Sequence, residues 1–121
     1  LVTTAGRSGL EIRTELAGAA PLPPDVDSAA YRIVQEALTN ALRHAAGADE
    51  VRVRVIAEEE CVRVTVTDNG STAPGGSALG TGRGLVGMRE RARLVGGGLR
   101  AGPRAGGGFE VAAWLPVERA S

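Results

Sequence analysis

Apolar and polar residues alternate along five stretches of the chain, and a period of two indicates β-strands. The clearest are two valine-rich stretches, one with arginines between the valines and one with arginine and threonines. The alternation predicts strands over 10–16, 51–55, 62–67, 99–101 and 109–115. The second and third of these strands are expected to form a hairpin through the acidic turn Glu58–Glu60.

Two other stretches carry apolar residues at helical spacing. The first helix is expected to be capped by Asp25, Asp27 or Ser28 and to end before Gly47. Its apolar positions are Ile33, Val34, Ala37, Leu38, Ala41, Leu42 and Ala45. The second is expected over 85–95, with three glycines ending it at 96–98.

Residues 70–83 are mostly Gly, Ser, Ala, Pro and Thr and offer little to bury, so we expect a mobile loop there, a candidate lid over a site. The order is therefore strand, helix, two strands, loop, helix and two strands. Because hairpin-linked strands are antiparallel, this order predicts an α/β (α+β) two-layer sandwich: a mixed, mostly antiparallel sheet with both helices on one face. A length of 121 residues suits one domain.

The amino-acid composition excludes several classes of function. Fourteen positive residues balance 14 negative ones, and only three residues are aromatic, so we expect no direct contact with nucleic acid. All the positive residues are arginine, which excludes a Walker-type P-loop because that motif requires a lysine. The single cysteine, Cys61, excludes an internal disulfide, and no apolar stretch is long enough to span a membrane. Since Met88 is the only methionine, we expect the chain to be a fragment.

Polar residues on the first helix form one candidate site. Glu36, Asn40, Arg43 and His44 recur at intervals that place them on one side of the helix. An acid and an amide oxygen spaced in this way can hold a hard cation such as Mg²⁺. A solvated polar stripe would show the same spacing, and a single histidine at a helix end is commonly a cap or dipole partner.

Two further motifs lie downstream. Asp68 ends a strand before Asn69-Gly70. This motif is either an ordinary turn, or it places the Asp68 carboxylate to accept a hydrogen bond from the amino group of a base. The stretch 82–87 matches GxGxxG, but no strand leads into it and no acid follows about 20 residues later, so a Rossmann site is rejected. Glycine-rich backbone at a helix start can still hold phosphates, and the order of all three motifs predicts a Mg-nucleotide site.

These motifs resemble those of a known family. Residues 36–45 (EALTNALRHA) resemble the N box, 68–70 (DNG) the G1 box and 82–91 (GRGLVGMRER) the G2 box of the ATP-binding domain of sensor histidine kinases. The resemblance covers about 9–117, leaving 1–8 as the end of a truncated linker and 118–121 as a tail. The G2 region and the ending from 106–108 to Leu115-Pro116 are similar to the nitrate-sensor-like class. The family shares the Bergerat fold with DNA gyrase, a mismatch-repair ATPase and a heat-shock chaperone.

The resemblance implies a role for each site residue. Asn40 would ligate Mg²⁺, and Glu36, the catalytic residue, would orient a metal-bound water or accept a proton. Asp68 would bind the adenine amino group of ATP, with Gly70 lining the base. The remaining residues would contact the phosphates, through backbone N–H groups at Gly82, Gly84, Leu85 and Gly87 and through positive charge at Arg43, His44 and Arg83.

Two positions depart from the family pattern. Thr72 stands where the G1 box usually has a second glycine, and Phe109 stands where the last strand often begins with a threonine. These departures leave open a nucleotide-free interaction module of the same fold, and a single-domain anti-sigma-factor serine kinase is the other alternative. The run 87–91 argues against the latter.

The resemblance also implies partners. Family kinases transfer the γ-phosphoryl group of ATP to a histidine on a separate dimerisation domain, and no helix of that kind precedes Leu10. We therefore expect a histidine-bearing dimerisation domain and a downstream response regulator as partners, with this fragment alone a monomer. The site is expected in the cytoplasm, with a parent protein that is either soluble or anchored in the membrane.

Overall fold

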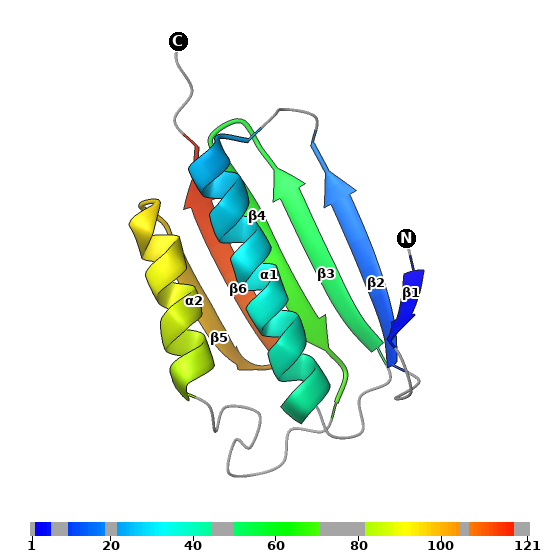
Figure 1. Cartoon of the computed structure of the whole chain (residues 1–121). Helices are drawn as coiled ribbons and strands as arrows, with labels where there is room; N and C mark the ends of the chain where they lie inside the picture. Colours follow the sequence, from blue (N-terminus) through cyan, green and yellow to red (C-terminus); the bar gives the residue numbers. More distant parts are fainter. Residues whose placement is uncertain are drawn as a thin grey trace.

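The computed structural model describes residues 2–5, 10–18, 22–44, 50–70, 82–104 and 107–117, and at 2–5, 10, 42–44 and 82–84 it describes the backbone alone. These residues form two helices and six strands (Figure 1). Their bounds in chain order are β1 Val2–Ala5, β2 Leu10–Ala17, α1 Pro24–His44, β3 Glu50–Ala57, β4 Cys61–Asp68, α2 Gly82–Leu94, β5 Gly98–Pro103 and β6 Phe109–Pro116.

All six strands belong to one sheet in the order β1-β2-β3-β4-β6-β5. Only the β2–β3 pair is parallel, because α1 carries the chain back between these two strands. The β3–β4 and β5–β6 pairs are the antiparallel hairpins that the alternation predicted, and β4 pairs with β6 along its whole length. A mixed, mostly antiparallel sheet is therefore confirmed. The first strand was expected at Leu10, whereas the shorter β1 precedes it and pairs with β2 at the edge of the sheet.

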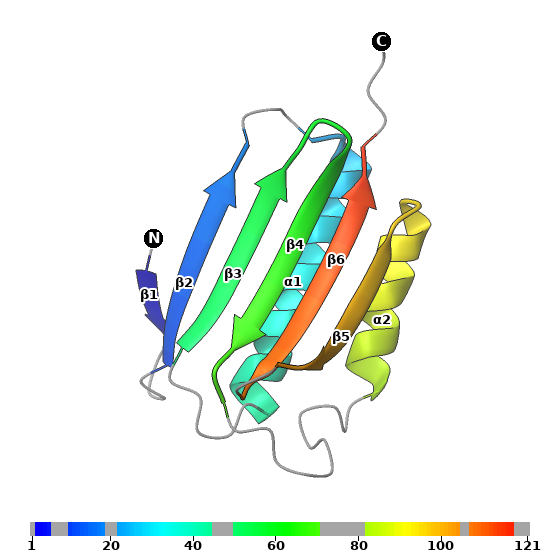
Figure 2. The ribbon, with the colours of Figure 1, turned by 180° about the vertical axis from the view of Figure 1, so that it is seen from behind.

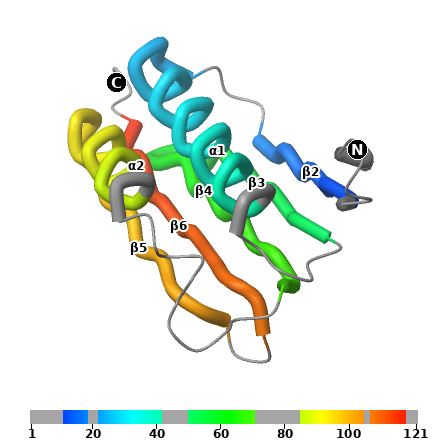
Figure 3. Tube along the Cα trace, turned by 60° about the horizontal axis from the view of Figure 1, so that its bottom comes forward, coloured from blue at the N-terminus to red at the C-terminus, as the bar shows by residue number. Residues whose placement is uncertain are grey.

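Both helices cover the same face of the sheet, as predicted, and Figure 2 shows the other face bare. The molecule has two layers, and the tilted view of Figure 3 shows α1 and α2 side by side above the sheet. The core lies between the layers. Its strand side chains are the inward positions of the alternation, among them Val51, Val53, Val62, Val64 and Val66.

Helix α1 contributes a buried stripe made largely of alanines. Ala29, Ala30, Ala37 and Ala41 are buried together with Ile33, whose exposed fraction is 0%. Alanines let the helix axis approach the valines of the sheet closely, and a buried isoleucine stabilises the fold by about 1.5–3 kcal/mol. The helical period of this stripe is the reason that α1 could be predicted over most of its length.

Helix α2 begins three residues earlier than expected. The predicted loop included Gly82 and Arg83 and the helix was expected to start near Leu85, which was wrong, since Gly82 is already helical. The end of α2 follows the glycines as predicted: Gly96 has a φ of +82°, and the N–H groups of Gly97 and Gly96 donate to the carbonyls of Ala92 and Arg93, at 2.8 and 2.9 Å. This pair of bonds is a Schellman motif.

The bare face of the sheet carries charged side chains linked by ion pairs. Glu50 accepts from Arg52 (2.7 Å) and pairs with Arg13 (3.4 Å), while Arg54 pairs with Glu15 (3.3 Å). Each pair is solvent-exposed and adds little stability. Neither described helix is long and apolar enough to cross a membrane.

Candidate nucleotide-binding site

Three chain segments with predicted site residues converge at one end of the molecule. The last turns of α1, the first turn of α2 and the final residue of β4 all lie at the lower end in Figure 1. Glu36, Asn40, Asp68 and the glycines of 82–87 thus reach the same end of the fold although they are spread over about half the sequence. Loop residues 71–81, which include Thr72 and most of the expected lid, lie outside the described residues.

Asp68 is the best-defined part of this site. It ends β4 on the side of the sheet that faces the helices, and it is the one buried charged residue among those described, with 8% of its surface exposed. Its Oδ1 accepts a hydrogen bond from the N–H of Gly70 at 2.9 Å. Its Oδ2 has no hydrogen-bond partner among the described residues. A buried carboxylate oxygen left in this state is an acceptor available to a ligand.

Asn69 has a structural role that the motif alone did not reveal. Its backbone N–H donates to the carbonyl of Glu50 at 3.2 Å, and its Oδ1 accepts from the N–H of Glu50 at 3.0 Å. These two bonds extend the β3–β4 pairing past the end of β4. The three residues of the Asp-Asn-Gly motif therefore have different roles. Asp68 presents a carboxylate, Asn69 holds the end of the strand by hydrogen bonds, and Gly70 orients the carboxylate.

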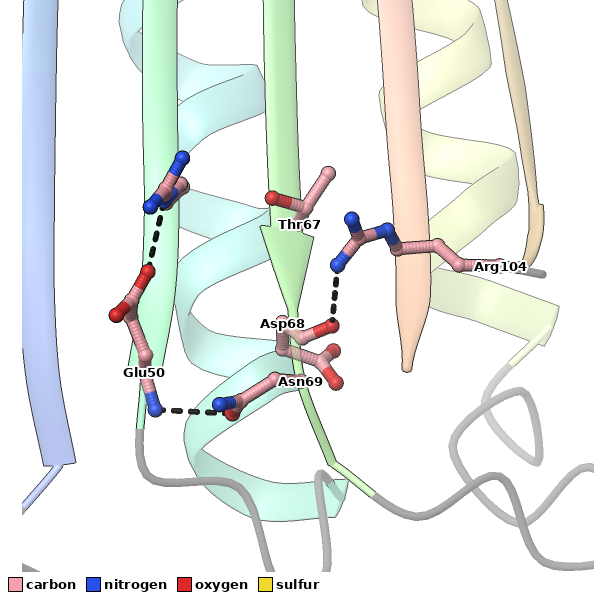
Figure 4. A pocket seen from close by; sticks show the side chains of 6 residues that line it. Glu50, Thr67, Asp68, Asn69 and Arg104 are labelled. Carbon is pink, nitrogen blue, oxygen red and sulfur yellow. Dashed lines mark hydrogen bonds and ion pairs between the residues drawn. The ribbon is translucent and has the colours of Figure 1, made fainter. Parts of the chain in front are cut away.

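The β5–β6 turn holds Asp68 from the other side. Nη1 of Arg104 donates to the backbone carbonyl of Asp68 at 3.3 Å (Figure 4). Gly108, with a φ of +92°, packs so closely on this carbonyl that an added Cβ would lie 2.0 Å from its oxygen. Phe109 begins β6 as expected, pairs with Asp68 in register and packs, half-buried, against the core.

Sequence reasoning missed Arg104 and Gly108 as supports of the site. The strands expected at 99–101 and 109–115 imply a turn between them, but this expectation places no residue of the turn beside Asp68. The contact depends on the register between β4 and β6, which joins residues 36 positions apart. An arginine directly before a glycine-rich turn was the only local signal.

The helix residues supply polar groups without partners in the described part of the chain. Asn40 is half-buried and Glu36 exposed, one turn apart on α1, and neither side chain has a hydrogen bond to another described residue. Arg43 and His44 lie in the last turn of α1, where the backbone alone is described. Between Glu36 and Asn40 on α1, the hydroxyl of Thr39 donates to the carbonyl of Gln35 at 2.9 Å, which keeps that hydroxyl on the helix.

The start of α2 offers backbone groups. Gly82, Arg83, Gly84 and Leu85 form its first turn, and the first four N–H groups of a helix have no acceptor within it, so they carry partial positive charge outward. The helix therefore begins within the predicted phosphate motif rather than after it. Farther along, Gly87 is half-buried, and a Cβ built on it meets no atom within 4 Å, so its surface is open for approach.

The described residues can be tested for their fit to a magnesium ion. They contain no group of three His, Cys, Asp or Glu side chains that could hold a metal by themselves. Mg²⁺ is commonly bound through one or two protein oxygens, with water and substrate phosphates filling the other positions. The amide of Asn40 has no partner among the described residues, and it lies on α1, whose last turns are at the same end of the fold as the start of α2. It suits that mode of binding.

The chain has a six-stranded mixed sheet with two helices on one face, and its polar groups gather where α1 ends and α2 begins. These features define the class of two-layer ATP-binding sandwiches with the Bergerat fold. A family model described as histidine kinase-, DNA gyrase B-, and HSP90-like ATPase matches residues 25–119. The chain belongs to this family, and ATP binding follows from that membership.

Relatives and solved structures agree with this assignment. The chain is 37% identical over 113 residues to the sensor histidine kinase YxjM of Bacillus subtilis (92% of this chain, 27% of the relative). It is 37% identical over 94 residues to the oxygen sensor histidine kinase NreB of Staphylococcus carnosus (77% and 27%). The chain thus spans about a quarter of the length of these curated relatives.

Among solved structures, the histidine kinase domain of a blue-light activated kinase from Erythrobacter litoralis matches with a TM-score of 0.70 at 28% identity, over 93% of this chain and 54% of that one. The ATP-binding domain of PrrB from Mycobacterium tuberculosis matches with a TM-score of 0.63 at 24% identity, over 89% and 82%, and supports the fold alone. The resemblance to sensor histidine kinases noted in the sequence is confirmed.

Proposed function

We propose that this chain binds Mg-ATP as the catalytic domain of a two-component sensor histidine kinase and donates the γ-phosphoryl group to a histidine on a separate dimerisation domain. The observation that carries the proposal is the buried carboxylate of Asp68, with one oxygen held by Gly70 and the other without a partner among the residues that the structure describes. It lies at the same end of the fold as the start of α2. The similarity to NreB favours the nitrate-sensor-like class.

Asp68 recognises the base in this proposal. Adenine presents an exocyclic amino group, which is a hydrogen-bond donor, and the free Oδ2 of Asp68 is an acceptor. Because Gly70 already engages Oδ1 at 2.9 Å, the carboxylate keeps its orientation before the nucleotide arrives. A hydrogen bond to a charged acceptor contributes roughly 1.5–3 kcal/mol.

The helices serve the phosphate end of the nucleotide. Asn40 holds the Mg²⁺ through its side-chain oxygen, and Glu36, one turn earlier, orients a water or accepts a proton. The N–H groups at Gly82, Gly84 and Leu85, together with the helix dipole, bind phosphate oxygens, with Gly87 leaving room and Arg43, His44 and Arg83 adding positive charge. When bound, Mg²⁺ neutralises charge that develops on the phosphates.

The histidine that accepts the phosphoryl group and the response regulator belong to other domains or proteins. Phosphoryl transfer depends mainly on positioning and charge stabilisation, so this domain acts once a dimerisation domain brings its histidine to the bound ATP. A response regulator then takes the phosphoryl group. Since ATP is a cytoplasmic substrate, we place the domain in the cytoplasm.

The decisive experiment is calorimetry of ATP binding to Asp68→Asn. Asparagine keeps an Oδ1 that can accept from Gly70, but it replaces the free oxygen by an NH₂ donor that faces the adenine amino group. We expect affinity to fall about 10- to 150-fold. Asp25→Asn is the matched control, since Asp25 is exposed in the first turn of α1, at the opposite end of the helix. A folded Asp68→Asn protein that binds ATP as the wild type does would refute the assignment.

Asn40→Ala separates the metal from the base. It is expected to reduce the gain in ATP affinity that Mg²⁺ provides while leaving adenosine binding unchanged, because the amide serves the metal. Equal losses for both ligands would contradict this role. If the wild-type chain binds no ATP with or without Mg²⁺, the proposal fails and the nucleotide-free interaction module becomes the better interpretation.

A further inference from the structure

A second polar hollow lies on the bare face of the sheet, opposite the helices. It has a volume of about 260 Å³ and is lined by Glu50, Arg52, Thr67, Asp68, Asn69 and Arg104. Figure 4 shows Glu50 on one side, Thr67 between, and the Arg104 side chain reaching in from the other side. Because side chains alternate along β4, Thr67 faces this hollow while the carboxylate of Asp68 belongs to the helix side.

Two acidic residues line the hollow, Asp68 and Glu50, and Glu50 belongs to the bare face and is paired with arginine. Oε1 of Glu50 accepts from Nε of Arg52 at 2.7 Å, and its Oε2 pairs with Nε of Arg13 at 3.4 Å. Arg13 lies outside the hollow and also pairs with Glu11 at 3.4 Å. The charge of Arg52 is thus balanced by Glu50, while the terminal nitrogens of Arg52 have no partner among the described residues.

Arg104 has no acidic partner among the described residues. Its one hydrogen bond there is the 3.3 Å contact from Nη1 to the carbonyl of Asp68, which carries no net charge. Four of its five N–H donors remain unengaged within the described part of the chain, as do the terminal nitrogens of Arg52 and the hydroxyl of Thr67. Donors thus converge on the hollow from two sides and from its floor.

Glu110 is a further carboxylate that opposes an anion here, besides Asp68 and Glu50, which line the hollow. It pairs with Thr67 in register and shares its face of the sheet, yet it does not line the hollow. A carboxylate this near to the hollow reduces its positive potential without occupying it. Neutralising Glu110 is therefore a way to raise that potential while leaving the donors in place.

We propose that this hollow binds one small oxyanion, a carboxylate or phosphate group, between the guanidinium groups of Arg52 and Arg104 and above the hydroxyl of Thr67. Arginine presents paired N–H donors that match the two oxygens of such a group. The volume lies just below the range of pockets that take drug-sized ligands, which suits a small anion. The site lies on the opposite face of the sheet from the nucleotide site, although Asp68 and Arg104 border both, and it does not require bound ATP.

The test is an NMR titration of the ¹⁵N-labelled 121-residue chain without nucleotide, with inorganic phosphate in one arm and succinate in the other. We expect saturable shifts at the amides of Thr67 and Asn69 and at the Nε–H groups of Arg52 and Arg104. The stronger ligand identifies phosphate or carboxylate as the preferred group.

Matched variants then assign the donors. Arg104→Gln and the near-isosteric Thr67→Val are each expected to weaken binding roughly tenfold or more, and Glu110→Gln to strengthen it. Arg100→Gln is the control. Arg100 is an exposed arginine of β5 on the bare face of the sheet, outside the hollow, and its loss should leave the affinity for the anion unchanged.

Three results would overturn the proposal. Shifts confined to the start of α2 would place the anion at the nucleotide site instead. Equal weakening by Arg100→Gln and Arg104→Gln would show general charge attraction, and shifts that never saturate would show ionic-strength effects alone. ATP binding is measured separately, through Asp68→Asn, so a failure of the anion site is distinguishable from a failure of the proposed function.

Discussion

The β5–β6 turn allows a sharp test of how the fold holds Asp68. Gly108 combines a φ of +92° with a position where an added Cβ would lie 2.0 Å from the carbonyl oxygen of Asp68. Gly107 has a φ of +112°, but its nearest neighbour, the carbonyl oxygen of Gly70, is 3.9 Å from such a Cβ. Gly102 in β5 has no positive φ and no atom within 4 Å. The three glycines thus separate backbone conformation from steric contact.

Alanine at each position should give a different change in the free energy of unfolding. Gly102→Ala should be neutral or stabilise by up to about 1 kcal/mol, since it removes backbone freedom from the unfolded chain. Gly107→Ala should cost about 1–2 kcal/mol for the strained φ alone. Gly108→Ala should cost about 3 kcal/mol or more, because backbone atoms must also move by over 1 Å to reach van der Waals distance.

Urea denaturation of the three variants measures these differences, and the Tm of Gly108→Ala should fall by roughly 10 °C or more. The ATP affinity of folded Gly108→Ala is expected to fall as well, since the displaced carbonyl belongs to Asp68. Equal stability losses at Gly107 and Gly108 would refute the argument, because they would show that contact with the Asp68 carbonyl adds nothing to the backbone term.

Two further predictions concern residues away from the site. Burial, followed by the negative charge of Glu58, raises the pKa of Cys61. The rate of Cys61 alkylation should therefore rise at higher pH than that of free cysteine. Glu58→Gln should move this pH profile to lower pH, and an unmoved profile would contradict the prediction. The indole of Trp114, 47% exposed, lies over Gly98, where an added Cβ would come within 2.3 Å of the ring. Gly98→Ala should displace the ring and red-shift the emission of this single tryptophan, and an unchanged spectrum would count against that packing.

The parts of the fold that sequence predicted are those with a strong local period. Helix α1 and the β3–β4 hairpin bury one side of a regular alternation or stripe, and their patterns extend over two or more turns or strand repeats. The start of α2 failed for the opposite reason: Gly82 and Gly84 are weak helix formers, and their composition resembles that of a loop. Strand β1 is four residues long, too short for a period to show.

The candidate site divides in the same way. Asp68 and Asn40 were found because a strand end and a helix face are local features. The supports of Asp68 were not, because Arg104 and Glu50 reach that strand end across 36 and 19 positions of sequence. Such contacts depend on which strands are neighbours and in what register, and the order of elements left both open.

The same supports explain why Asp68 suits the recognition of a base. Its side chain is held by Gly70, its carbonyl by Arg104, and the next residue, Asn69, is fastened twice to Glu50. A group that is already oriented loses little conformational entropy when a ligand binds, so more of the hydrogen-bond energy appears as affinity. Asn40 has no such supports among the described residues, and this fits a group whose geometry is completed by a metal ion and phosphates rather than by the protein alone.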